Sequence, residues 1–423
     1  MPDDLGAPMP AARSIESRAS WMAAGVTLAI LSVAYGATLL IVVGLRAMEA
    51  DLGLDRSVLA LAGALTWVGT GLGGIAMGWL ADRIGMRASV TLGAVMVSAG
   101  LALSAAGHLW AIYFGHGILI GLFGMGAIYP PLVTYVSRWF DRRRGTAVAL
   151  ISSGQYVAGV VWPAVFAWVL AGPGWRAAYL SYAGVVLLWV IPLALLFLRP
   201  PPAAALAGPG ADGPARGGGA VLGLSPNTVQ AMLCAAGFCC CVPMSIPQGH
   251  LVAFCGDLGI SATTGATMLS VLLGCAFISR QFWGLFADRN GGLLGVFAGS
   301  SCQALAILAF MLTQNEAGLF SVAAAYGLGF SGIIPSYVVA IRDLFPSREA
   351  SWRVPLVLFT SMGGMAFGSW FAGRLYDLFG FYEPAFGIGV LFNLANLALV
   401  GTLVLRQQRR GGYRPAGFAP APG

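Results

Sequence analysis

The chain has 423 residues and contains no lysine, so all 23 of its basic residues are arginines. Charge of either sign is scarce: charged residues make up 9% of the sequence, and Asp and Glu together number 16. A soluble domain carries roughly 25% charged residues, and a chain of this length cannot cover a water-facing surface with so few. We therefore exclude an ordinary soluble protein and expect most of the surface to face the lipid bilayer.

Recognisable enzyme chemistry is also missing from the sequence. It has no nucleotide-binding loop, no cluster of metal ligands and no nucleophile motif. The seven cysteines include the run 239–241 in an apolar segment, and none has the spacing of a zinc site, so we interpret them as small helix-packing residues. We expect no enzyme activity, no cofactor and no metal site.

What the sequence has in abundance is long apolar runs. Hydrophobic residues make up 58% of the chain, the mean hydropathy is +0.81, and there are 60 glycines, which allow helices to approach closely in lipid. A bilayer core of about 30 Å needs about 20 apolar residues to be crossed by a helix. The predicted spans lie near 21–45, 58–80, 89–107, 110–137, 147–171, 177–198, 227–253, 264–287, 294–313, 318–341, 354–376 and 384–405. The fold class is thus an all-α membrane protein with twelve transmembrane helices.

The spans fall into two sets of six. Residues 199–226 between them are rich in Pro and Gly, and we interpret them as a cytoplasmic linker between bundles 21–198 and 227–405. Residues 1–20 lack the apolar core of a signal peptide and form a tail, as do residues 406–423.

The arginines predict the orientation of the chain. With the N-terminus inside, only Arg46, Arg56, Arg176 and Arg374 fall in the outer loops, and the other loop and tail arginines face the cytoplasm. By the positive-inside rule, both termini of this multi-pass protein are cytoplasmic, and we expect it in the inner (plasma) membrane. This explains the net charge of +7 without a nucleic-acid partner.

The two halves repeat each other. The segment at 78–85 reads GWLADRIG, and the segment 206 residues later at 284–291 reads GLFADRNG. A second echo relates Gly124, Pro130 and Phe140 to Gly329, Pro335 and Phe345. Two echoes at nearly one offset indicate duplicated halves related by an axis along the membrane normal.

These motifs resemble the signature of the major facilitator superfamily, which implies two pseudo-symmetric six-helix bundles around a central cavity with rocker-switch alternating access. The segments 124–159, 250–261, 279–289 and 373–387 look like those of monocarboxylate transporters and oxalate/formate antiporters. That resemblance implies that Arg280 binds a substrate carboxylate, and that the protein is a monomer. The chain differs from several monocarboxylate carriers at Ala276, where they place an acidic residue, and in having no lysine.

Arg280 is the most informative single residue. It lies well inside a predicted span, where a charge must line a cavity or find a partner. We find no Asp or Glu deep in any predicted span, so an anionic substrate could supply the counter-ion, and a guanidinium fits a carboxylate. The alternative is that Arg280 extends toward the cytoplasm or bonds to a tyrosine or carbonyl.

Other polar residues in the spans are candidates for binding and coupling. Five tyrosines and Phe330, which shares a face with Tyr326, are candidates to line the cavity, with packing as the alternative. His250 and Asp257 are candidates for proton coupling, with His116 as a further one, and hydrogen-bonded structure or helix capping as the alternative. The acid–arginine pairs of the repeated motif are candidates for gating. The tyrosines are Tyr35, Tyr129, Tyr156, Tyr326 and Tyr337, and the gating residues are Asp82, Arg83, Asp288 and Arg289.

The function that these residues favour is secondary transport of a small organic anion such as lactate or pyruvate, with a proton. A carboxylate exchanger and an efflux carrier for another small metabolite remain alternatives. An enzyme or a sensor is disfavoured because no site for either is recognisable.

Overall fold

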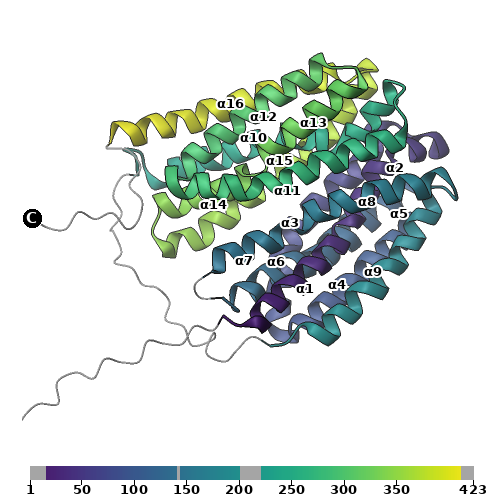
Figure 1. Cartoon of the computed structure of the whole chain (residues 1–423), viewed down its shortest axis with the longest axis horizontal. Helices are drawn as coiled ribbons and strands as arrows, with labels where there is room; N and C mark the ends of the chain where they lie inside the picture. The colour runs from purple at the N-terminus through teal and green to yellow at the C-terminus, as the bar shows by residue number, and fades with distance from the viewer. Residues whose placement is uncertain (1–15, 141–142, 201–220, 411–423) are drawn as a thin grey trace, which may run out of the picture.

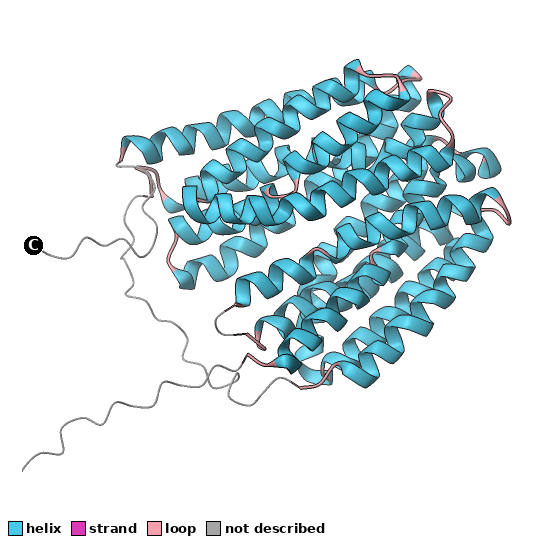
Figure 2. Cartoon of the chain, in the orientation of Figure 1, coloured by secondary structure: helices cyan, strands magenta, loops and turns pink. Residues whose placement is uncertain are grey.

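The computed structural model describes residues 16–140, 143–200 and 221–410. Most of the predicted linker and tails therefore lies outside the described residues. The described chain contains twelve helical spans long and apolar enough to cross a membrane, and Figure 2 shows helices joined by short loops. The predicted fold class is confirmed, and the largest boundary difference is at the first span, which ends at Leu52 instead of residue 45.

Within the described ranges, the spans are built from seventeen helical segments. Eight spans are single helices, whereas spans 1, 4, 5 and 10 are each divided into two or three segments. In chain order the segments are α1 (Arg18–Ala34), α2 (Gly36–Leu52), α3 (Arg56–Ile84), α4 (Met86–Ser104), α5 (Leu109–Phe114), the π-helix η1 (Gly115–Met125), α6 (Gly126–Ser137), α7 (Arg144–Ser152), α8 (Gly154–Ala171), α9 (Trp175–Phe197), α10 (Pro226–Asp257), α11 (Ala262–Asn290), α12 (Gly292–Leu312), α13 (Glu316–Phe330), α14 (Ile333–Leu344), α15 (Ser347–Phe379) and α16 (Glu383–Arg409).

The helices form two bundles, α1–α9 and α10–α16, which lie side by side in Figure 1. The start of α1 and the end of α16 are at the same end of the molecule, as an even number of spans requires. We call this the proximal end and the opposite one the distal end. Loops such as 53–55 and 258–261 are therefore distal.

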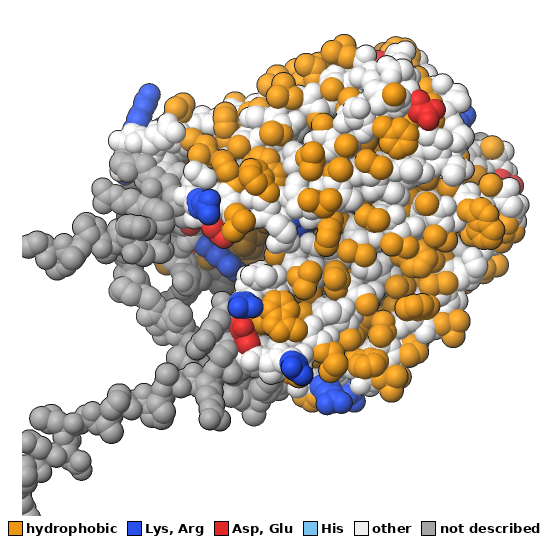
Figure 3. All heavy atoms as spheres, in the orientation of Figure 1, with side chains coloured by type: hydrophobic (Ala, Val, Ile, Leu, Met, Phe, Trp, Pro, Cys, Tyr) orange, Lys and Arg blue, Asp and Glu red, His pale blue; other side chains and the backbone are white. Residues whose placement is uncertain are grey.

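The flanks of the molecule expose many large apolar side chains, and contact of so much apolar surface with water would be unfavourable. Ile75, Trp168 and Leu188 are each more than 70% exposed. Figure 3 shows hydrophobic side chains over the flank and charged side chains gathered at the ends. Such an apolar belt needs lipid around it, which makes the chain a multi-pass membrane protein.

The two bundles touch mainly in their distal halves. The extensive contacts between them pair α2 with α10, α3 with α15, and α8 with α11. Helices α2 and α8 are the distal parts of spans 1 and 5, whereas the proximal parts α1 and α7 make no comparable contact with the second bundle. The structure is therefore closed at the distal end, and its bundles separate toward the proximal end.

Proline explains part of the irregularity of spans 4 and 10. Pro130 and Pro335 carry no N–H, so the carbonyls four residues earlier lose their usual donors. The π-helical segment η1 ends at Met125, and the break between α13 and α14 lies at 331–332, close to those carbonyls. Spans 4 and 10, which occupy equivalent positions in the two halves, are thus both irregular near an equivalent proline.

Candidate functional site

Tyr35 lies at a break in span 1. Helix α1 ends at Ala34 and α2 begins at Gly36, and side chains from neighbouring helices occupy the gap. The Tyr182 hydroxyl donates to the Val33 carbonyl at 2.6 Å, and the Trp162 indole N–H donates to the Ser32 carbonyl at 2.8 Å. These bonds satisfy the backbone that the break exposes, which is how an interrupted helix is tolerated in a membrane.

Gly36 is required for this arrangement. A β-carbon at this position would lie 1.9 Å from the Tyr182 hydroxyl oxygen and 2.8 Å from the Trp162 ring. Any side chain here would push both donors away from the break, so the glycine keeps Tyr35 in its place.

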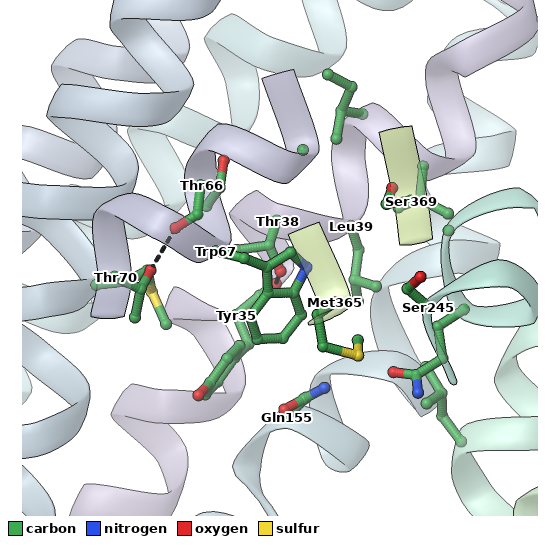
Figure 4. A pocket seen from close by; sticks show the side chains of 17 residues that line it. Tyr35, Thr38, Leu39, Thr66, Trp67, Thr70, Gln155, Ser245, Met365 and Ser369 are labelled. Carbon is green, nitrogen blue, oxygen red and sulfur yellow. Dashed lines mark hydrogen bonds between the residues drawn. The ribbon is translucent and has the colours of Figure 1, made fainter. Parts of the chain in front are cut away.

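Tyr35 lines a cavity of about 70 Å³ between the two bundles (Figure 4). A cavity of this volume can hold a few water molecules, so in this conformation it admits a small solute or part of a larger one. Its wall is neutral, with hydroxyl, amide, thioether and aromatic groups. The lining residues are Tyr35, Thr38, Leu39, Ile41, Val42, Gly63, Thr66, Trp67, Thr70, Met125, Gln155, Ser245, Gln248, Gly249, Leu273, Met365 and Ser369.

Arg280 lies on the proximal side of this cavity, at the seam between the bundles. It follows the lining residue Leu273 on α11 by seven residues, about 10 Å along the helix. Its guanidinium carbon is 5.3 Å from the ring centre of Tyr156, which belongs to the other bundle. Its Nε is buried and has no hydrogen-bond partner among the described residues. A charged donor without an acceptor is costly unless a ligand completes it.

Several of the predicted aromatic residues contact one another near the seam. Tyr35 and Tyr129 meet edge to face at 5.7 Å, and Tyr156 meets Phe330 across the seam at 6.2 Å. Phe330 in turn stacks on Tyr326 at 4.8 Å, as their shared helix face predicts. The structure therefore places Tyr156 between Arg280 and Phe330 at the interface, whereas Tyr35 packs on Tyr129 at the cavity wall.

Two predicted tyrosines lie elsewhere. Tyr337 is fully buried within the second bundle, and its hydroxyl donates to Asn396 at 2.8 Å, while Asn396 donates to Ser300. Tyr326 is also fully buried and donates to the Met244 carbonyl at 3.1 Å. Neither is among the residues that line the central cavity.

A charge network closes the distal seam. The Arg56 side chain is 4% exposed and bonds to Glu49 on α2 and to Asp257 on α10, at 2.8 and 2.5 Å. Asp377 of α15 accepts from the backbone N–H groups of Arg56 and Ser57, at 3.0 and 2.9 Å, so it caps α3 from the other bundle. We call Glu49, Arg56, Asp257 and Asp377 the distal charge network.

The predicted coupling residues His250 and Asp257 both connect to Arg56. Arg56 donates to the Tyr382 hydroxyl at 3.1 Å, and that hydroxyl lies 2.8 Å from Nδ1 of His250. Burial raises the pKa of Tyr382, so this phenol keeps its proton. His250 Nε2 lies 2.7 Å from the Ser369 carbonyl, and Ser369 lines the central cavity.

His116 is separate from both sites. It is fully buried in η1, where Nδ1 lies 3.2 Å from the Ser104 hydroxyl and Nε2 lies 3.4 Å from the Tyr179 hydroxyl. This places it in the packed interior of the first bundle.

The predicted gating residues lie at the proximal end and do not bridge the bundles in this state. Asp82 pairs with Arg138 of its own bundle at 3.2 Å, and both side chains are exposed, so the pair contributes little stability. The Arg83 guanidinium lies 3.6 Å from the ring centre of Trp79. Asp288 and Arg289 are exposed at the end of α11.

Sequence reasoning missed most of the distal charge network and the cavity wall. Arg56 was expected in an outer loop, and Glu49, Asp377 and Tyr382 were not singled out. Glu49 and Tyr382 are 333 positions apart in the sequence, so only the fold brings these residues together. The sole signal available was an arginine directly beside a predicted span.

The sequence matches the model of one known protein family. Residues 25–246, just over half of the chain, match the model of the Major Facilitator Superfamily. Monocarboxylate transporter 11 of Homo sapiens is 28% identical over 393 residues, which cover 86% of this chain and 79% of that protein. Monocarboxylate transporter 13 of Bos taurus is 26% identical over 77% of this chain and 75% of its own length. The MFS-type transporter pynF of Aspergillus niger is 26% identical, covering 76% and 73%.

Solved structures agree on the fold. A bacterial homologue of the human lysosomal transporter Spinster, in an inward-facing and unoccupied conformation, superposes with a TM-score of 0.65 at 17% identity, covering 95% of this chain and all of that one. A POT family transporter in complex with a thioalcohol-conjugated peptide gives 0.70 at 13% identity, covering 93% and 97%. The described residues form twelve spans in two bundles around a central cavity, and the family model matches over half of the sequence, so this chain belongs to the Major Facilitator Superfamily of transporters.

Proposed function

We propose that this protein is a secondary transporter that carries a small organic anion, such as a monocarboxylate, together with a proton. The observation that carries the proposal is Arg280, a cation at the seam between the bundles. Its buried Nε donates no hydrogen bond to any described residue. A carboxylate bound there would touch both bundles, through Arg280 of one and Tyr156 of the other. Its binding could therefore favour one arrangement of the bundles over another.

The names of the relatives support an anion of this class, since several are monocarboxylate transporters. His250 and Asp257 are the proposed proton-coupling groups, because both belong to the hydrogen-bonded path between the distal seam and the cavity wall. The proposed gating role of Asp82, Arg83, Asp288 and Arg289 belongs to the proximally closed state. We place the protein as a monomer in the inner (plasma) membrane with both termini cytoplasmic, so that the proximal end faces the cytoplasm.

A second candidate is efflux or exchange of another small metabolite. It is favoured by relatives of a different kind, among them the Agnestins efflux protein AgnL12 of Paecilomyces divaricatus. An exchanger would require substrate on the opposite side of the membrane, and a symporter would not.

The test is a thermal-shift measurement on the purified protein with lactate, pyruvate and other short carboxylates at pH 5.5 and 7.5. A ligand that binds only the folded state raises Tm by mass action. We expect short carboxylates to raise Tm for the wild type and to have at most a tenth of that affinity, a difference of about 1.4 kcal/mol, for Arg280→Gln.

The matched control is Arg374→Gln, which removes an exposed arginine near the distal end of α15. It should respond to carboxylates like the wild type. An undiminished response in a folded Arg280→Gln variant would contradict the assigned role of Arg280.

A further inference from the structure

The partners of Arg56 are divided between the two bundles. Glu49 lies on α2 of its own bundle, whereas Asp257 and Tyr382 belong to the other bundle. If the two bundles separated as rigid bodies at the distal end, Arg56 would keep Glu49 and lose Asp257 and Tyr382. A buried guanidinium without a carboxylate would be very costly, and Glu49 removes that cost in either state.

The bonds around His250 fix its state while the distal end is closed. The Ser369 carbonyl can only accept, so Nε2 carries the hydrogen. The Tyr382 oxygen accepts from Arg56, so its own O–H is free to donate to Nδ1. The chain of donors therefore runs from Arg56 through Tyr382 and His250 to Ser369, and it requires a neutral imidazole.

An imidazolium would break this chain. Its Nδ1–H would face the Tyr382 O–H, whose proton would have to turn toward Arg56, a group with no acceptor atom. The other charged groups nearby are Arg46, 3.7 Å from Asp257, and Asp377, which is held by the start of α3. The Tyr376 ring lies 3.6 Å from the Arg56 guanidinium carbon. None of them bonds to His250, so Tyr382 is its link to the seam.

We propose that Arg56 is the positioning residue that couples closure of the distal side to release of a proton from His250. This rests on the proton coupling of the proposed function. In the distally open state, Tyr382 is freed from Arg56 and can accept from a protonated His250. Closure restores the Arg56–Tyr382 bond, and one N–H bond of the imidazolium breaks as the proton passes to water or to the substrate carboxylate in the cavity.

By linkage, a proton on His250 must favour the open distal side to the same extent that closure favours its release. The two backbone N–H groups that Asp377 caps give a readout of this equilibrium that needs no substrate. We expect them to exchange slowly with deuterium while Asp377 accepts from them, and to exchange faster once opening exposes them. Exchange at Arg56 and Ser57, corrected for the intrinsic effect of pH with an unstructured reference, therefore reports opening even if no carboxylate is ever transported.

In the wild type, we expect corrected exchange at these two amides to rise between pH 7.5 and pH 5.5. Arg56→Gln and Asp257→Asn should each speed exchange at pH 7.5 by about ten-fold, because the ion pair across the seam is lost. The matched control is Asp51→Asn, which breaks an equally distal pair with Arg176 inside one bundle and should leave exchange unchanged. Wild-type exchange rates in both Arg56→Gln and Asp257→Asn would overturn the role of Arg56 in closure.

The link to the proton is tested by Tyr382→Phe and His250→Gln, which leave the Arg56–Asp257 pair in place. Both should remain closed at pH 7.5 and lose the rise in exchange at pH 5.5. A full rise in folded His250→Gln would overturn the proposal and assign the pH response to the carboxylates. If the exchange results hold while no carboxylate binds, the coupling inference stands and the proposed substrate class fails.

Discussion

Arg56 and Arg280 are both arginines within membrane-spanning helices, but their surroundings differ in a way that separates their roles. Arg56 is 4% exposed and has carboxylates from both bundles, so its charge is neutralised by the protein itself. Arg280 is partly exposed at the seam and has an aromatic ring beside it with no carboxylate bonded among the described residues. A cation of the first kind holds parts together, and one of the second kind is available to a ligand.

The same distinction applies to the buried tyrosines. Tyr337 donates to Asn396 in the interior of the second bundle, so Tyr337→Phe leaves a buried amide oxygen without its donor, at a cost of about 1–3 kcal/mol. We expect this variant to have a lower Tm than the wild type and the same carboxylate-induced rise in Tm. Thermal unfolding with and without ligand checks both expectations. A variant with unchanged Tm and no ligand-induced rise in Tm would instead support a role of Tyr337 in substrate binding.

For single residues, the sequence indicates candidates for the site but does not indicate which of them lie together in the fold. Arg280 and His250 could be singled out because a charged or titratable group inside an apolar run is rare. The choice among five tyrosines could not be made, because the rotation of each helix depends on packing against its neighbours. Tyr382 shows the limit: it lies in a short loop, and only contact with Arg56 and His250 gives it a role.

At the scale of helices, the apolar runs determine where the chain crosses the membrane, and all twelve spans were predicted for that reason. The breaks within spans were not. A break in lipid depends on donors from other helices, such as Tyr182 and Trp162 at the end of α1, and periodicity carries no information about them. Tyr35 was a candidate to line the cavity and does so, but the break beside it and most of the other lining residues were not predicted.

Close approach of helices across the seam also depends on single residues. A β-carbon at Gly373 of α15 would lie 2.9 Å from the Cα and 3.1 Å from the backbone nitrogen of Ser57 on α3. Backbone atoms cannot move aside as a side chain can, so Gly373→Ala should separate α3 from α15 and favour the open distal side. We expect faster exchange at the Arg56 and Ser57 amides with little loss of Tm.

Gly327→Ala is the matched control for this prediction. A β-carbon at Gly327 would lie 2.1 Å from the Leu272 carbonyl oxygen, but both residues belong to the second bundle. We expect this variant to have a lower Tm than the wild type and wild-type exchange rates at the Arg56 and Ser57 amides. The same response in both variants would mean that Gly373 affects folding and not the seam.

At the scale of the whole molecule, the duplicated halves predicted two bundles around a central cavity, but not the state in which they meet. Both bundles have an apolar face, and the internal repeat does not indicate whether they meet at the proximal or the distal end. The distal end is closed here because the acids Asp257 and Asp377 of one bundle meet Arg56 and the start of α3 of the other. Such pairing depends on residues outside the repeated motifs.

Charge balance over a whole transport cycle gives the last prediction. A monocarboxylate that crosses with one proton moves no net charge, whereas an anion that crosses alone moves one. A full charge is worth about 2.3 kcal/mol per 100 mV, enough to change the accumulation ratio about fifty-fold. We expect uptake into proteoliposomes to follow an imposed pH gradient and to be unaffected by an imposed potential of either sign. The control is the same vesicles preloaded with substrate: uptake that appears only after preloading would identify an exchanger, and uptake that follows the potential would exclude symport with a single proton.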